Sequence, residues 1–214
     1  MKTKNALFIV LLITFLASAA QVKIVSPVEQ IITEGQVLDL GIVGPGQKIE
    51  IVAHRESGEK NVGGTNALWD QIQIVGGSLE PGWQGVASQL YESPLKAFVI
   101  ISKNAGDGTY EFQVKTVDEY EGLTPITFKV RVQVSKDVLE LVAEPSSRKA
   151  GAGQPALFFI KLRNKSSASD AFEVTASGLP GASKYTRKVF VSHNAEQGIA
   201  YELIVGEKGE YDIV

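Results

Sequence analysis

The stretch Gly44-Pro45-Gly46-Gln47 occurs a second time, 107 residues later, as Gly151-Ala152-Gly153-Gln154. Each copy follows a strand-like segment and opens another, Lys48 to Ala53 in the first case and Pro155 to Leu162 in the second. Glycine-rich turns separate strands, and a turn that recurs about one domain length apart indicates two copies of one fold.

Two further landmarks recur in the same order. Leu79-Glu80-Pro81-Gly82 is matched by Leu179-Pro180-Gly181, and Gly108-Thr109-Tyr110 is matched by Gly209-Glu210-Tyr211. Their offsets are about 100 and 101 residues, and loops of different length account for the drift. The chain therefore reads as two tandem units.

Strands with alternating polarity fill both units. The clearest case ends the first unit, where Phe128, Val130, Val132 and Val134 alternate with polar residues. Such alternation places one face in a core and the other in water. With no helical periodicity, the sequence predicts an all-β fold: two tandem immunoglobulin-like antiparallel β-sandwiches, residues 21–135 and 138–214, after an N-terminal signal peptide.

Composition limits the classes of function. The chain has 214 residues, 44% hydrophobic content and a formal charge of −3, without any basic block. Nucleic acid and acidic membrane surfaces are therefore excluded as expected partners. Cysteine is absent, which rules out disulfides, thiolate metal sites and a cysteine nucleophile in this sequence.

Residues 1–20 have the features of a signal peptide. Lys2 and Lys4 precede an apolar run from Ala6 to Ala17, and small residues follow as Ala17-Ser18-Ala19-Ala20. Without the two lysines the charge becomes −5. The alternative is an uncleaved membrane anchor, but the run is shorter than the ~20 residues that a spanning helix needs. We expect an exported protein, extracellular or on the cell surface, with any other anchor outside this sequence.

Tyr110 and Tyr211 are candidates for tyrosine corners, in which a tyrosine hydroxyl near the start of a late strand bonds to backbone upstream. The alternative is that both are ordinary half-buried strand residues. Only three residues follow Tyr211, so the second sandwich is expected to lack its last strand. Either the sequence is a piece of a longer protein, or a partner donates the missing strand.

Catalytic motifs are not found. Gly76-Gly77-Ser78-Leu79-Glu80 breaks the Gly-x-Ser-x-Gly pattern at its last position, and neither Gly-x-Gly-Gln turn has the Lys-Ser/Thr of a phosphate loop. His54 and His193 are the only histidines and are expected on the surface. We predict no enzyme and assign no catalytic or cofactor-binding residue.

Binding candidates are few. Trp69, Trp83 and Tyr91 all fall in the first unit, where exposed and coplanar rings could stack on sugars. The alternative places Trp69 in the core and Trp83 across one end of the sandwich. Asn164-Lys165-Ser166 is a glycosylation sequon in a predicted loop.

Acidic residues gather around one strand of the first unit. Asp107 precedes this strand, and Asp118, Glu119 and Glu121 follow it. Several carboxylates could chelate Ca²⁺, although the spacing matches no calcium motif. The alternative is a solvated turn, so no cofactor is assigned.

Short motifs of the second unit carry a resemblance to a known class. Phe159 to Ser166, a strand followed by an Asn-led loop, and Ser177-Gly178-Leu179-Pro180 are similar to immunoglobulin-like modules of the CARDB and NEW3 types. These modules occur in tandem on prokaryotic, especially archaeal, surface proteins. The first unit departs from them in its long polar loop from Arg55 to Asn66.

The resemblance implies a non-catalytic structural or adhesive module whose partners are proteins or surface polymers. The alternative is a carbohydrate-binding accessory domain of a polysaccharide-active enzyme, acting through Trp69, Trp83 and Tyr91.

Overall fold

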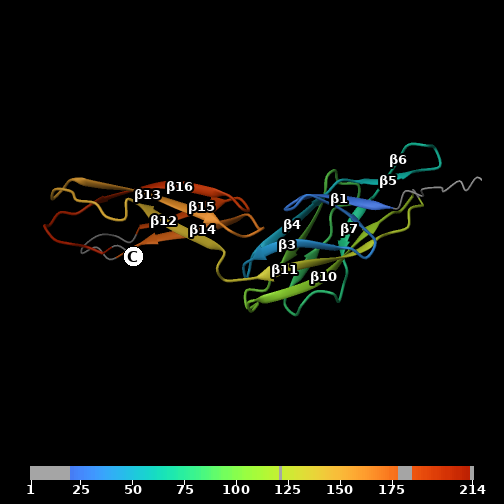
Figure 1. Cartoon of the computed structure of the whole chain (residues 1–214), viewed down its shortest axis with the longest axis horizontal. Coiled ribbons are helices and arrows are strands. Elements are labelled where there is room, and N and C mark those ends of the chain that lie inside the picture. The colour runs from blue at the N-terminus through green and yellow to red at the C-terminus, as the bar shows by residue number, and fades with distance from the viewer. Residues whose placement is uncertain (1–19, 121, 178–184, 213–214) are drawn as a thin grey trace, which may run out of the picture.

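The computed structural model describes residues 20–120, 122–177 and 185–212, which form strands β1 to β16 and no helix. Two units lie end to end along the long axis of the molecule (Figure 1). The predicted signal peptide falls outside the described residues except for Ala20. No described helix could cross a membrane.

Two facing sheets make up the first unit. One has the order β2 (Gln30–Thr33), β1 (Gln21–Ser26), β4 (Lys48–Ala53), β9 (Leu95–Ile100), β8 (Gln84–Val86). The other has the order β3 (Val37–Val43), β11 (Thr127–Val134), β10 (Gly108–Val117), β7 (Gln71–Ile74). All neighbours are antiparallel except β3 and β11, which are parallel.

The second unit has a three-stranded and a two-stranded sheet, both antiparallel. The first is ordered β12 (Leu139–Glu144), β13 (Pro155–Asn164), β16 (Glu196–Ile204). The second pairs β14 (Asp170–Ala176) with β15 (Tyr185–Val191).

Each unit buries the apolar face of its alternating strands. In β11 the side chains of Phe128, Val130, Val132 and Val134 are buried, while the residues between them are more exposed. They join one continuous core that includes Trp69, and a separate cluster forms in the second unit. The predicted all-β fold of sandwich type is confirmed.

The repeated turn has the same geometry in both units. Gly46 and Gly153 have positive φ angles of 81° and 72°, a region that glycine enters without the steric penalty of a Cβ. The amide of Gln47 donates to the carbonyl of Gly44 at 3.1 Å, and that of Gln154 donates to Gly151 at 2.9 Å. The two stretches therefore mark equivalent hairpin positions.

Both predicted tyrosine corners form. The Tyr110 hydroxyl donates to the carbonyl of Gly106 at 3.1 Å, and the Tyr211 hydroxyl donates to that of Glu207 at 3.3 Å. In each case the acceptor lies four residues upstream, so the two corners are equivalent. This supports the assignment of the second unit as a copy of the first.

One loop prediction is wrong. The stretch from Arg55 to Asn66 is not an open loop, because β5 (Glu56–Lys60) pairs with β6 (Asn66–Leu68) as a hairpin. Its polar composition hid this pairing, since few apolar side chains mark a buried face. Strands β2 and β8 were also missed, because four and three residues are too short to show a period.

The sequon residue Asn164 is buried with 0% exposure, so its expected placement in an exposed loop is wrong. Its side-chain amide donates to the carbonyls of Ala168 at 2.7 Å and of Val191 and Ser192 at 3.2 Å. Its side-chain oxygen accepts from both the amide and the hydroxyl of Ser166. A glycan on this nitrogen is incompatible with the fold.

The loop that Asn164 holds contacts the first unit. The amide of Ser167 donates to the carbonyl of Ile42 at 2.8 Å, and Ala168 packs into the core of the first unit. The side-chain amide of Gln47, from the repeated turn, donates to Asp170 at 3.2 Å. These contacts join the two units directly, in addition to the linker.

We predict that Asn164→Ala destabilises the second unit by about 3 kcal/mol, because it leaves several buried polar groups without partners. Urea unfolding followed by circular dichroism measures the loss. Lys165→Ala is the matched control: it removes only a surface ion pair with Asp137 and is expected to cost under about 1 kcal/mol. Equal stability of the two variants would contradict the role of Asn164.

Candidate functional site

Three loops meet at the end of the first unit that faces away from the second. They are residues 54–70, which include the β5–β6 hairpin, residues 87–94 between β8 and β9, and residues 118–126 between β10 and β11. We call them the distal loop cluster. In sandwiches of this kind, loops gathered at one end can vary while the sheets hold them in place.

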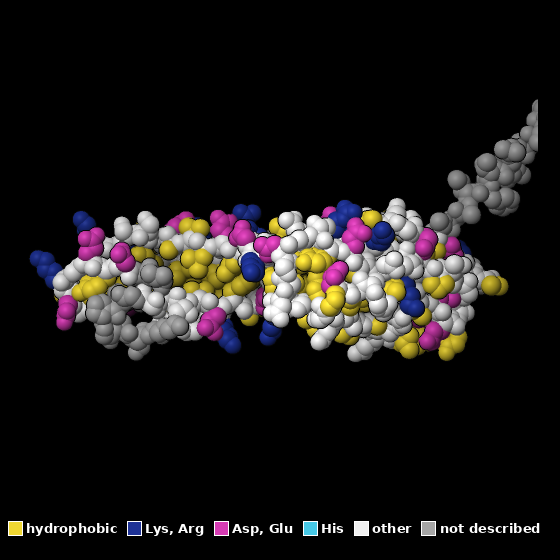
Figure 2. Space-filling view, turned by 90° about the horizontal axis from the view of Figure 1, so that it is seen from below, with side chains coloured by type: hydrophobic (Ala, Val, Ile, Leu, Met, Phe, Trp, Pro, Cys, Tyr) yellow, Lys and Arg dark blue, Asp and Glu magenta, His cyan; other side chains and the backbone are white. Residues whose placement is uncertain are grey.

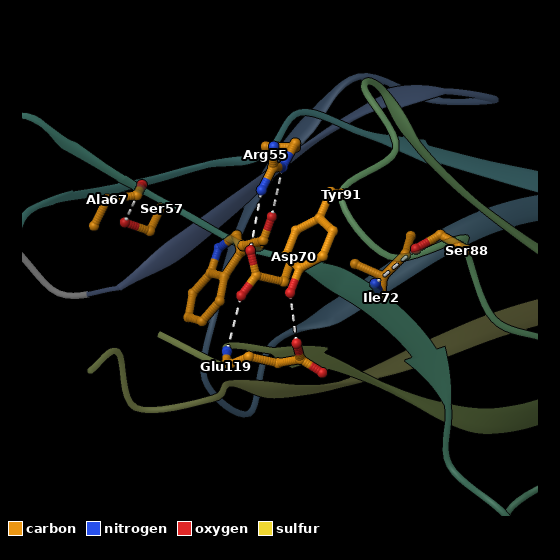
Figure 3. Close-up of polar contacts among 9 residues, drawn as sticks. Arg55, Ser57, Ala67, Asp70, Ile72, Ser88, Tyr91 and Glu119 are labelled. Atoms are coloured by element: carbon orange, nitrogen blue, oxygen red, sulfur yellow. Dashed lines mark hydrogen bonds and ion pairs between the residues drawn. The ribbon is translucent and has the colours of Figure 1, made fainter. Parts of the chain in front are cut away.

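Asp70 fastens the three loops together (Figure 3). Its buried carboxylate accepts a hydrogen bond from Arg55 at 3.0 Å and another from the amide of Glu119 at 2.8 Å. Its backbone carbonyl accepts from the amide of Tyr91 at 2.8 Å. One residue thus binds a side chain or backbone group from each loop.

The ion pair at the centre of the cluster is well satisfied. Arg55 also donates through Nε to the carbonyl of Trp69 at 2.9 Å. Among the described residues, no buried side-chain nitrogen or oxygen lacks a hydrogen-bond partner. A buried ion pair costs desolvation free energy, which such additional hydrogen bonds offset. The loops are therefore held by a specific polar network rather than by apolar packing alone.

Tyr91 has a constrained conformation within this network. Its φ angle is 61°, a left-handed value that costs a non-glycine residue about 1–2 kcal/mol. The hydroxyl donates to Glu119 at 2.6 Å, and the Arg55 guanidinium lies 5.8 Å from the ring centroid. The hydrogen bond to Glu119 raises the pKa of the Tyr91 phenol far above its ordinary value, with burial a smaller cause. The phenol therefore stays protonated.

Large apolar side chains are exposed on all three loops. They are Val62 on the hairpin, Leu90 and Tyr91 on the second loop, and Tyr120, which is 82% exposed, on the third. Leu90, Val62 and Tyr120 were missed from sequence, as were Arg55 and Asp70. A tyrosine inside the acidic run that begins at Asp118 was the only available signal.

The structure does not bring Trp69, Trp83 and Tyr91 together as a platform. Trp69 is fully buried, with its indole N–H donating to the carbonyl of Gln21 at 2.8 Å. Trp83 is buried against Tyr110, with ring centroids 5.3 Å apart. Only Tyr91 is exposed, so both tryptophans take the core positions of the alternative interpretation.

A shallow cavity of about 350 Å³ borders the cluster. Its lining consists of Val25, His54, Arg55, Glu56, Leu68, Ser93 and Pro94. The Arg55 guanidinium is already engaged by Asp70, so the cavity offers no free cation to an anionic ligand.

The acidic residues that could have formed a calcium site are separated. Asp107 accepts a hydrogen bond from the amide of Lys136 at one end of β10, whereas Asp118 and Glu119 lie beyond the other end. Ten strand residues span roughly 30 Å. Glu121 lies outside the described residues, and within them no three His, Asp or Glu side chains could hold a metal.

The two histidines are also far apart in the fold. His54 is exposed in the distal loop cluster, and His193 is half-buried beside Ser169 in the second unit, near the contact between the units. Since they lie at different ends of the molecule's first unit, they do not form a shared site.

No family model and no curated protein matches the chain. Two solved structures show a distant likeness. One is a protein of unknown function from Porphyromonas gingivalis W83, with 10% identity, 79% of this chain and 81% of that chain covered, and a TM-score of 0.28. The other is the set of fibronectin(III)-like modules of Clostridium thermocellum CbhA, with 15% identity, coverages of 89% and 99%, and a TM-score of 0.32. At these scores, neither supports an argument about function.

We predict that Asp70→Ala destabilises the first unit by about 2–3 kcal/mol, because it strands the Arg55 guanidinium without its partner. It is also expected to broaden the NMR signals of Tyr91 and Glu119, whose amides bond to Asp70. Glu50→Ala removes an exposed carboxylate from the outer face of β4 and serves as the control, with an expected cost within about 0.5 kcal/mol. A similar stability for both variants would show that Asp70 does not organise the loops.

Proposed function

We propose that the chain is a non-catalytic, exported binding module that contacts a partner through the distal loop cluster. The observation that carries the proposal is that exposed apolar side chains on three loops are held by one buried ion pair, Arg55 with Asp70. Export follows from the signal-like residues 1–20.

The constrained loops favour binding over a purely structural role. A loop ordered in advance loses less conformational entropy when a partner binds, so more of the contact free energy becomes affinity. Tyr91 has a strained backbone, and strained residues concentrate at functional sites. Tyrosine is also enriched at interfaces, because it offers a large rigid contact area with a polar tip.

Charge points to the kind of partner. The distal loop cluster carries the exposed or half-exposed carboxylates Glu56, Glu59, Glu92 and Glu119, while Arg55 is neutralised by Asp70. An acidic rim around apolar residues suits a neutral or basic protein surface, since complementary charge speeds association and excludes acidic partners.

A surface polymer is the second candidate, favoured by one specific observation. Tyr91 and Tyr120 are both exposed, and their side chains interact with each other. Aromatic rings stack on the apolar faces of sugars, so these two residues replace Trp69 and Trp83 in the carbohydrate-binding hypothesis.

A binding assay on envelope fractions of the source cell tests the proposal. We expect the double variant Leu90→Ser/Tyr120→Ser to weaken binding of the labelled protein at least about tenfold, which corresponds to losing ~1.4 kcal/mol at an interface centre.

The matched control is Ile31→Ser/Val86→Ser, which removes two comparably exposed apolar side chains from β2 and β8 of the same unit. Unchanged binding by the loop variant, or an equal loss in both variants, would refute a role for the distal loop cluster. Parallel assays on insoluble cellulose, xylan and chitin separate the candidates: retention that depends on Tyr120 would favour the polymer.

A further inference from the structure

Strand β14 of the second unit has an edge without a partner. In the first unit the equivalent strand, β7, pairs with β10, for example through Ile72 opposite Thr116, and β10 in turn pairs with β11. Among the described residues, β14 pairs only with β15. Its other edge therefore presents backbone N–H and C=O groups in the position where β7 meets β10.

The core beside this edge is open. Leu141 of β12 is paired with Leu162 of β13, so the two side chains lie on the same, core-facing side of the sheet. Leu162 is 0% exposed, yet Leu141 is 52% exposed. In the first unit, Val22 and Ile24 of the opening strand β1 are fully buried. Figure 2 shows apolar side chains gathered along one face of the second unit.

The first unit shows what fills this position. Its strands β10 and β11 contribute Phe112, Val114, Phe128 and three valines to the core, and they enter the sandwich directly after the Tyr110 corner. The second unit forms the same corner at Tyr211. The sequence that leaves it, Asp212-Ile213-Val214, matches Glu111-Phe112-Gln113 in polarity except at its last residue, with Ile213 in the place of the buried Phe112.

We propose that the groove between β12 and the free edge of β14 is a strand-docking site, and that its occupant is the segment of this polypeptide that leaves the Tyr211 corner. The segment begins with Asp212-Ile213-Val214, pairs antiparallel with β14, and returns as a second strand over β12. Its chemistry is an extended hairpin with apolar residues at alternate positions.

Two observations select this occupant over a strand from another molecule. The corner at Tyr211 fixes the direction in which the chain approaches, as Tyr110 does for β10. The free edge demands a partner with backbone donors and acceptors in strand spacing, which a flat apolar partner surface lacks. Docking covers Leu141 and closes the core that the described strands leave open.

The absence of cysteine makes a clean test possible, because a single introduced thiol reports only its own position. Leu141→Cys and Val142→Cys place the thiol on opposite faces of β12, towards and away from the groove. Each variant of the polypeptide, made in its source cell, is treated with a maleimide under native conditions. Ala143→Cys is a second groove-facing probe that adds only a sulfur atom, in case Leu141→Cys does not fold.

We expect the groove-facing thiols to react at least about 100-fold more slowly than Val142→Cys, because they react only from opened molecules. Adding Ile213→Asp should remove this protection, whereas Val214→Asp, on the opposite side of the segment, should preserve it. Groove-facing thiols that react within about threefold of Val142→Cys would overturn the proposal. Protection that is lost on dilution would also overturn it, since the occupant would then belong to a second molecule.

Discussion

A β-strand can bury one face only if a second sheet covers that face, and this constraint governs both halves of the molecule. The first unit satisfies it with nine strands in two sheets, so Trp69, Phe112 and Phe128 are almost fully enclosed. The described strands of the second unit satisfy it only in part, because two strands face three. The same alternating sequence pattern thus gives a closed core in one copy and an open one in the other.

Buried polar groups, rather than apolar packing, set the two ends of the first unit. At one end Asp70 holds the loops that carry Tyr91 and Tyr120, and at the other the loop fixed by Asn164 contacts Ile42 and Gln47. Apolar contacts are non-directional, whereas hydrogen bonds specify one geometry. The network around Asp70 therefore favours one arrangement of the loops, and the contact around Asn164 favours one placement of the second unit.

Much of the fold could be predicted from sequence, because alternation and turn chemistry are local signals. The strand from Lys48 to Ala53, the Gly-x-Gly-Gln turns and both tyrosine corners are examples. The candidate site could not, because it depends on contacts between residues far apart in sequence. Asp70 is an unremarkable acidic residue until the fold places Arg55 and Glu119 beside it. Asn164 carries a surface signature, the sequon, yet internal hydrogen bonds make it a core residue.

Amide hydrogen exchange of the 214-residue chain, resolved by residue, tests the central claim most directly: that the chain holds one closed and one open copy of the same sandwich. We expect the amides of β4, β9, β10 and β11 to exchange only through global unfolding of the first unit. Those of β12 and β14 should exchange at least about 100-fold faster, through local opening. Equal protection of β7 and β14, strands at equivalent positions in the two copies, would contradict the account.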